Sequence, residues 1–188
     1  MKKRSAVISI AIGLIAALVL AVILIPQKED KPMDTNLTVT SPAFADGGDI
    51  PARYAATGEE VSPPLAIGGL PSGAVSVAVI MDDIDAPVIG TVYHWVLWNI
   101  PPTTEIPEDV PREKELPSLG GACQGRNTMF RIGYMGPNPP SGIHRYRIHV
   151  YALDTMLDLA PGAGHRKLEK AMEGHILGYG ILSGRFSK

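Results

Sequence analysis

The stretch GPNPPSGIHRYRIHVYAL, residues 136–153, joins a stiff loop to a clear strand. From Arg145 onward polar and apolar side chains alternate, so that Tyr146, Ile148 and Val150 share one face. A period of two predicts a β-strand with one buried face and one wetter face. The three prolines before it stiffen the loop, and the two glycines let its backbone approach a ligand closely. We therefore predict a pocket-forming loop that leads directly into a central strand.

Other apolar segments extend this pattern to a β-rich domain. Residues 75–81 and 92–100 are rich in β-branched or aromatic side chains and predict buried strands. Shorter strands are expected at residues 37–40 and 180–186. One helix is expected at about residues 165–177, where an apolar stripe ends before a glycine. With 20 glycines and 17 prolines in the chain, the pattern favours a mainly β fold with long ordered loops.

The N-terminal segment differs from the rest of the chain. A basic start precedes the uncharged residues 6–25, which at about 1.5 Å per residue reach across a hydrocarbon core of about 30 Å. No small-x-small cleavage site directly follows this run. We expect residues 1–26 to be an uncleaved transmembrane signal anchor with its N-terminus in the cytoplasm. Residues 27–36 then form a polar tether, and 37–188 an extracytoplasmic domain; cleavage would instead release a secreted protein.

The charge and cysteine content narrow the function further. From residue 37 onward the chain carries 12 Lys and Arg residues against 16 Asp and Glu residues, with no basic stripe. This composition argues against nucleic acid as a partner. The single cysteine, Cys123, excludes an intrachain disulfide, and a domain of about 150 residues buries enough core to fold without one. We expect Cys123 to be buried and inert.

Acidic and histidine side chains gather where the predicted strands end. Asp83 and Asp85 follow the first buried strand, and Pro87 fixes the exit of the chain. Asp82 is interpreted as a turn residue that bonds backbone amides. His94 lies within the next strand, where a buried imidazole needs a partner for each ring nitrogen. A carboxylate that accepts from one nitrogen leaves the other for a ligand.

A second histidine follows the proline-rich loop. His144 and Tyr146 are two residues apart, so they point to the same face of their strand. Two imidazoles, a phenol and nearby backbone amides favour a cradle for an oxyanion such as a phosphate ester. On these residues alone, a metal centre with Asp and His ligands stays open as an alternative.

A series of short blocks follows the same order along the chain. The blocks are SPAF at 41–44, GGDIP at 47–51, EVSPPL at 60–65, DIDAP at 83–87, HWV at 94–96, GRN at 125–127, PPSG at 139–142, HRY at 144–146 and EGHIL at 173–177. Taken together, they resemble the phosphatidylethanolamine-binding protein (PEBP) family, also called the Raf kinase inhibitor protein family, in its bacterial and archaeal branch. The resemblance covers about residues 37–185.

The resemblance implies a β-sandwich-like fold in which a large antiparallel sheet packs on a smaller one, with a few short helices including one near the C-terminus. It also implies a pocket, without metal or cofactor, for phosphate or the phosphoryl head group of ethanolamine lipids. Carried over position by position, the pocket residues are Asp83, Asp85, Pro87, His94, Gly136, Pro139, Pro140, His144 and Tyr146. The chain departs from the family pattern at Met135, Asn138 and residues 128–130, where we expect a reshaped entrance.

Three functions are therefore weighed. We expect a non-enzymatic protein that binds a small anionic or phosphate-bearing ligand and modulates another protein. The resemblance also implies an alternative, an inhibitor of a protease or kinase that acts through surface loops such as residues 105–121. A metal-dependent hydrolase is the third hypothesis, but the sequence contains neither a Ser-centred nucleophile elbow nor an HExxH motif.

Overall fold

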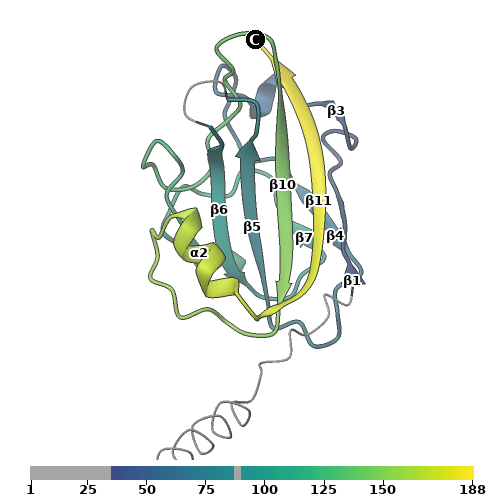
Figure 1. The fold of residues 1–188 in the computed structure, drawn as a ribbon, viewed down its shortest axis with the longest axis vertical. Helices are drawn as coiled ribbons and strands as arrows, with labels where there is room; N and C mark the ends of the chain where they lie inside the picture. The colour runs from purple at the N-terminus through teal and green to yellow at the C-terminus, as the bar shows by residue number, and fades with distance from the viewer. Residues whose placement is uncertain (1–34, 87–89) are drawn as a thin grey trace, which may run out of the picture. The chain divides into compact units, whose positions relative to one another are not determined.

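The structure, a computed structural model, describes residues 35–86 and 90–188. The expected transmembrane segment at residues 6–25 and the expected pocket residue Pro87 lie outside these ranges. Within them, no helix is long and apolar enough to cross a membrane. Two β-sheets and one α-helix make up the described domain (Figure 1).

The larger sheet has eight strands, and its long central strands are antiparallel. Two short strands, β1 and β3, add to β11 in parallel. In spatial order the main path is β1 (Thr35–Asn36), β11 (Ile176–Ser187), β10 (Ile143–Leu153), β5 (Ser76–Asp83), β6 (Val92–Ile100), β9 (Ala122–Gln124) and β8 (Glu115–Leu116), with β3 (Gly48–Asp49) beside β11. The sheet thus includes residues 35 and 36, which the composition assigns to the tether.

The smaller sheet packs against one face of the larger sheet. It is formed by β2 (Thr38–Thr40), β4 (Leu65–Gly68) and β7 (Glu105–Ile106), and a single hydrophobic cluster contains residues of both sheets. The alternation that the sequence shows along β10 is confirmed, because Tyr146, Ile148 and Val150 are all buried in this cluster. The predicted mainly β fold with a large and a small sheet is therefore confirmed.

The opposite face of the large sheet is partly covered by α2 (His165–Met172), which lies against β6 (Figure 1). Leu168 and Met172 of the helix are buried in a second apolar cluster with residues of β5 and β6. The helix is shorter than predicted. Gly174, with φ +74°, turns the chain, and β11 begins at Ile176, so the predicted helix end at residue 177 is wrong.

Residues 105–121 lie mostly at the surface, as their polar, proline-rich sequence predicts, and short strands within them join both sheets. They contribute β7 to the small sheet and β8 to the large one, with a 3₁₀ turn at Pro117–Leu119. Ile106, Val110 and Leu116 are buried in the main core. A second 3₁₀ turn lies at Ala52–Tyr54. Segment 105–121 therefore links the two layers.

Candidate functional site

Three strands meet at one end of the large sheet and bring the predicted site residues together. The register pairs Asp83 at the end of β5 with Val92 at the start of β6, and with Tyr146 near the start of β10. A cavity of about 380 Å³ lies at this end. We call it the histidine pocket; its lining residues are Ala56, Asp83, Ala86, Val92, His94, Thr128, Met129, Arg131, Met135, Gly136, Asn138, Pro139, Pro140, His144 and Tyr146. Seven of the nine predicted residues therefore line one cavity.

His144 and Asp83 form a buried pair in this pocket. His144 Nδ1 lies 2.8 Å from Asp83 Oδ2, and the two side chains are 7% and 6% exposed. The other oxygen of Asp83 accepts the backbone N–H of Asp85 at 2.9 Å. Because the carboxylate accepts, the proton of the imidazole lies on Nδ1, and Nε2 is left for a ligand.

His94 is oriented by a backbone carbonyl instead of a carboxylate. Its Nδ1 lies 2.8 Å from the carbonyl oxygen of Met135, which can only accept, so this nitrogen carries the proton. Burial lowers the pKa of His94, and this effect exceeds the opposing effects of the Met135 bond and the Asp83 charge. His94 is therefore neutral at pH 7, and its Nε2 is a hydrogen-bond acceptor.

The Tyr146 hydroxyl makes no well-aligned hydrogen bond among the described residues, although the Asp83 carboxylate and the Asn138 backbone lie near it. The Tyr146 side chain is 1% exposed. Burial and the nearby Asp83 carboxylate raise the pKa of this phenol, so it stays protonated. Its ring meets that of His94 edge to face, with centroids 5.2 Å apart. A buried hydroxyl of this kind costs about 1–3 kcal/mol when it is left unsatisfied.

Gly136 shapes the pocket for a reason that the sequence did not predict. A Cβ at this position would lie 2.5 Å from the backbone nitrogen of Ala56, so only glycine fits against the 54–56 segment. Its N–H donates to Glu60 Oε1 at 3.2 Å. Ala56 in turn donates to the carbonyl of Pro137 at 3.0 Å. Gly136 therefore also fixes the proline-rich loop to the domain, and close approach of its backbone to a ligand stays a prediction.

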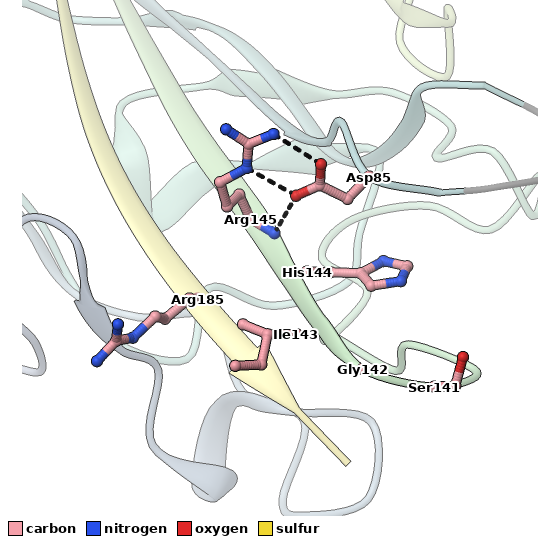
Figure 2. A pocket seen from close by; sticks show the side chains of 7 residues that line it. All are labelled: Asp85, Ser141, Gly142, Ile143, His144, Arg145 and Arg185. Atoms are coloured by element: carbon pink, nitrogen blue, oxygen red, sulfur yellow. Dashed lines mark hydrogen bonds and ion pairs between the residues drawn. The ribbon is translucent and has the colours of Figure 1, made fainter.

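Asp85 does not line the histidine pocket, contrary to the prediction. Its carboxylate accepts three hydrogen bonds from Arg145, two from the guanidinium at 2.8 Å and one from the backbone N–H at 2.9 Å. Figure 2 shows this pair and His144 in the lining of a neighbouring cavity of about 570 Å³. The hydrogen bonds from Arg145 lower the pKa of Asp85 to about 2. Asp85 thus ties the exit of β5 to the start of β10 outside the pocket.

The side chains of Asp82 and Cys123 also lie in environments that differ from those predicted. Asp82 bonds side chains and not backbone amides: it accepts two bonds from Arg147 at 2.9 and 2.6 Å and lies 3.3 Å from His149 Nε2. Cys123 is half-buried, and burial followed by the Glu115 charge raises the pKa of its thiol. Within residues 35–86 and 90–188, no three His, Cys, Asp or Glu side chains are arranged to hold a metal ion.

Several residues that line the histidine pocket were not predicted from the sequence. Arg131 and Met129 reach the pocket from the loop at 128–131, and Ala56 reaches it from the segment before β4. A signal for the loop was present, because residues 128–130 depart from the pattern of the resembling family. No signal pointed to Ala56, since its place depends on the close approach of Gly136.

The fold and the pocket define a two-sheet β domain with a small polar binding pocket at one end of its large sheet. Residues 40–187 match the family model described as phosphatidylethanolamine-binding protein. The chain belongs to this family.

Relatives support the assignment. A UPF0098 protein of Pyrococcus horikoshii is 49% identical over 150 residues, which cover 79% of this chain and 75% of the relative. A UPF0098 protein of Methanothermobacter thermautotrophicus is 50% identical over 148 residues, covering 78% of this chain and 95% of the relative.

Two solved structures are similar. A PEBP homolog from Chlamydia trachomatis has a TM-score of 0.74 and 35% identity, covering 81% of this chain and 98% of that one. Escherichia coli YbcL, described as a member of the mammalian PEBP family, has a TM-score of 0.74 and 27% identity, covering 82% and 99%.

Proposed function

We propose that this protein binds a small phosphate-bearing ligand in the histidine pocket, without catalysing a reaction on it. The observation that carries this proposal is the buried Tyr146 hydroxyl, which makes no well-aligned hydrogen bond among the described residues. It lines the same cavity as His94 and His144, whose Nδ1 atoms are already engaged. The family model names phosphatidylethanolamine, which is itself a phosphate ester, and this supports the proposed ligand class.

The hydrogen-bonding roles of the pocket favour a ligand with both donors and acceptors. Tyr146 donates, whereas neutral His94 accepts at Nε2. A phosphate group that keeps one proton offers a P–OH to His94 and oxygens to Tyr146. A phosphodiester with an ammonium group also offers both roles. A phosphate monoester loses its second proton near pH 6, so we expect its affinity to fall as the pH rises above that value.

The pocket chemistry supports a binding role over an enzymatic one. Its described lining contains no serine, cysteine or lysine, and Asp83, His94 and His144 are engaged in hydrogen bonds within the fold. The Thr128 hydroxyl in the lining accepts the backbone N–H of Tyr93 at 2.8 Å. The inhibitor alternative keeps its exposed segment, residues 105–121, but β7 and β8 tie this segment into both sheets.

We also propose that the N-terminal residues 6–25 hold the domain at a membrane, outside the cytoplasm. The chain enters the sheet at β1, which pairs with Gly178 and Tyr179 of β11. The histidine pocket lies beside Phe186, at the other end of the same strand. Seven residues of extended strand span roughly 23 Å, so the pocket is remote from the point of entry and stays open to soluble ligands or to a modulated protein partner.

Titration calorimetry with inorganic phosphate tests the assignment in the full-length chain in detergent. His144→Ala is expected to weaken phosphate binding by about tenfold or more, because it removes a buried polar contact. His175→Ala is the matched control, since His175 also pairs with an aspartate at 2.8 Å, but outside the pocket. Equal phosphate affinity in the wild type and His144→Ala would exclude the histidine pocket as the binding site.

A further inference from the structure

The arginines of the described domain fall into two groups. The ion-paired group consists of Arg53, Arg112, Arg145, Arg147 and Arg185. The others have no ion-pair partner within residues 35–86 and 90–188: Arg126, Arg131 and Arg166. All three lie on the 126–131 loop or at the start of α2. In a domain with more acidic than basic residues, unpaired cations gathered in one region indicate a site for negative charge.

A second cavity contains two of these three arginines, whereas Arg131 lines the histidine pocket. Arg126, Arg166 and Lys167 line a cavity of about 840 Å³, which we call the cationic cavity. Glu169 is the one carboxylate in its described lining, so the side chains leave an excess of two positive charges. Its volume lies within the range of about 300–1,000 Å³ that is typical of small-molecule sites.

The cationic cavity is distinct from the histidine pocket. Tyr93 lines the cationic cavity and His94 lines the histidine pocket, as alternation along β6 requires. The 126–131 loop separates the two, and Thr128 contributes to both linings. A ligand in one cavity therefore does not occupy the other.

The walls of the cationic cavity are held in place before any ligand arrives. The Asn127 side chain, 4% exposed, accepts the backbone N–H groups of Met129 and Arg131 at 3.0 and 3.1 Å. The ring of Tyr93 stacks on that of His165, with centroids 3.4 Å apart and planes inclined by 11°. This rigid arrangement reduces the entropy lost when a ligand binds.

Two further features suit an anionic ligand with a planar group. The first turn of α2 has no acidic residue and no side-chain cap, so the positive end of the helix adds to the side-chain charges. Phe130 in the cavity lining is 80% exposed and has φ +59°, an uncommon conformation for an aromatic residue. The Asn127 bonds maintain this turn and keep the ring at the surface.

We propose that the cationic cavity is a second ligand site, which binds a ligand with two neighbouring phosphate charges independently of the histidine pocket. Two negative charges match the excess of two positive charges, and a diphosphate is the simplest ligand of this kind. Tyr93 and Phe130 then provide aromatic surface for a ring attached to the diphosphate.

Nuclear magnetic resonance of the isotope-labelled full-length chain in detergent, titrated with pyrophosphate, tests the proposal. Backbone amides of residues 162–167 report the cationic cavity, and those of residues 143–146 report the histidine pocket. We expect saturable shifts at residues 162–167, weakened about tenfold or more by Lys167→Ala. Lys170→Ala is the matched control: it removes the same charge from the same helix, outside the cavity lining, and is expected to change affinity less than about twofold.

The outcomes separate this proposal from the proposed function. An absence of saturable shifts at residues 162–167, or equal losses in Lys167→Ala and Lys170→Ala, would overturn the second site. His144→Ala is expected to leave the shifts at residues 162–167 unchanged. Shifts at residues 162–167 with none at residues 143–146, for either pyrophosphate or phosphate, would support the second site and contradict the proposed function.

A comparison of two probes identifies the ligand class. If the physiological ligand carries a planar ring, adenosine diphosphate is expected to bind the cationic cavity more tightly than pyrophosphate. Phe130→Ala is then expected to lower the affinity for adenosine diphosphate to that for pyrophosphate and to leave the pyrophosphate affinity unchanged. Equal affinity of the two probes would show that the diphosphate charge is recognised by itself. Both results support the second site and distinguish a ring-bearing ligand from a free diphosphate.

Discussion

Replacing Tyr146 by Phe removes one buried hydroxyl from the histidine pocket and leaves the ring in place. The hydroxyl makes no well-aligned hydrogen bond among the described residues; its neighbouring polar groups are the Asp83 carboxylate and the Asn138 backbone. An unsatisfied buried polar group costs about 1–3 kcal/mol. We therefore expect the free energy of unfolding of the ligand-free variant to stay equal or to rise by about 1 kcal/mol. Phosphate binding is expected to move in the opposite direction. A hydrogen bond to a charged group contributes about 1.5–3 kcal/mol, which corresponds to a Kd about tenfold to 150-fold weaker.

The opposed signs make this experiment informative. Urea unfolding followed by the fluorescence of the buried Trp95 and Trp98 measures stability, and calorimetry with phosphate measures affinity. Tyr151→Phe is the matched control, because Tyr151 belongs to the same strand but does not line the histidine pocket. Its phosphate affinity is expected to equal that of the wild type. The reasoning is refuted if Tyr146→Phe binds phosphate as tightly as the wild type, or if it loses more than about 1 kcal/mol of stability.

Three further substitutions test the arrangement around the pocket. Asp85→Asn is expected to change phosphate affinity less than about twofold in calorimetry, because Asp85 lies outside the histidine pocket; a larger loss would restore its predicted role. Gly136→Ala is expected to lower the free energy of unfolding in urea by about 1–3 kcal/mol, because the added Cβ would lie 2.5 Å from a backbone atom. In the control Gly164→Ala the added Cβ meets no atom within 4 Å, so the free energy of unfolding should fall by less than about 1 kcal/mol. Asp82 is buried, which opposes ionisation, yet bonds from its histidine and arginine partners lower its pKa from 3.8. The ionised Asp82 therefore stabilises the fold above about pH 4, and this stabilisation is lost as the pH falls through the folded-state pKa. Asp82→Asn should lower stability at pH 7. It should also weaken the fall of the urea midpoint with decreasing pH, measured from pH 6 to pH 2.

The alternation along residues 145–153 was sufficient to predict the central strand and the shared face of His144 and Tyr146, because side-chain direction in a strand is a local property. It was not sufficient for Asp85. The chain leaves β5 after Asp83, so the two carboxylates are no longer related by the period of a strand. The orientation of His94 by the Met135 carbonyl is equally non-local, since it depends on how the loop before β10 folds back over β6.

The end of the helix shows a different reason for failure. Both Gly174 and Gly178 are glycines that can end a helix, and a single sequence does not rank them. The structure uses Gly174 in the left-handed conformation, because β11 must begin early enough to pair along the whole of β10. Tertiary pairing therefore decides which local signal is used. The unpaired state of Arg126 and Arg166 is likewise a property of the assembled chain; the GRN block marked Arg126 only as part of the family resemblance, and no pattern marked Arg166.

The 126–131 loop forms a wall of both cavities, so its rigidity should affect both proposed ligands. Asn127 makes three hydrogen bonds within this turn, to Met129, Arg131 and Gly133. Asn127→Ala removes all three, each of which contributes about 1 kcal/mol, and is expected to loosen the turn while the strands stay paired. If both sites depend on this turn, phosphate affinity at residues 143–146 and pyrophosphate affinity at residues 162–167 should fall together in the same magnetic resonance titrations. A loss at one site with no change at the other would show that the loop is not a common support. Because the two sites are proposed to bind independently, saturation of the wild-type protein with phosphate should leave its pyrophosphate affinity unchanged; a change of the same factor in both directions would instead show that the loop couples the sites.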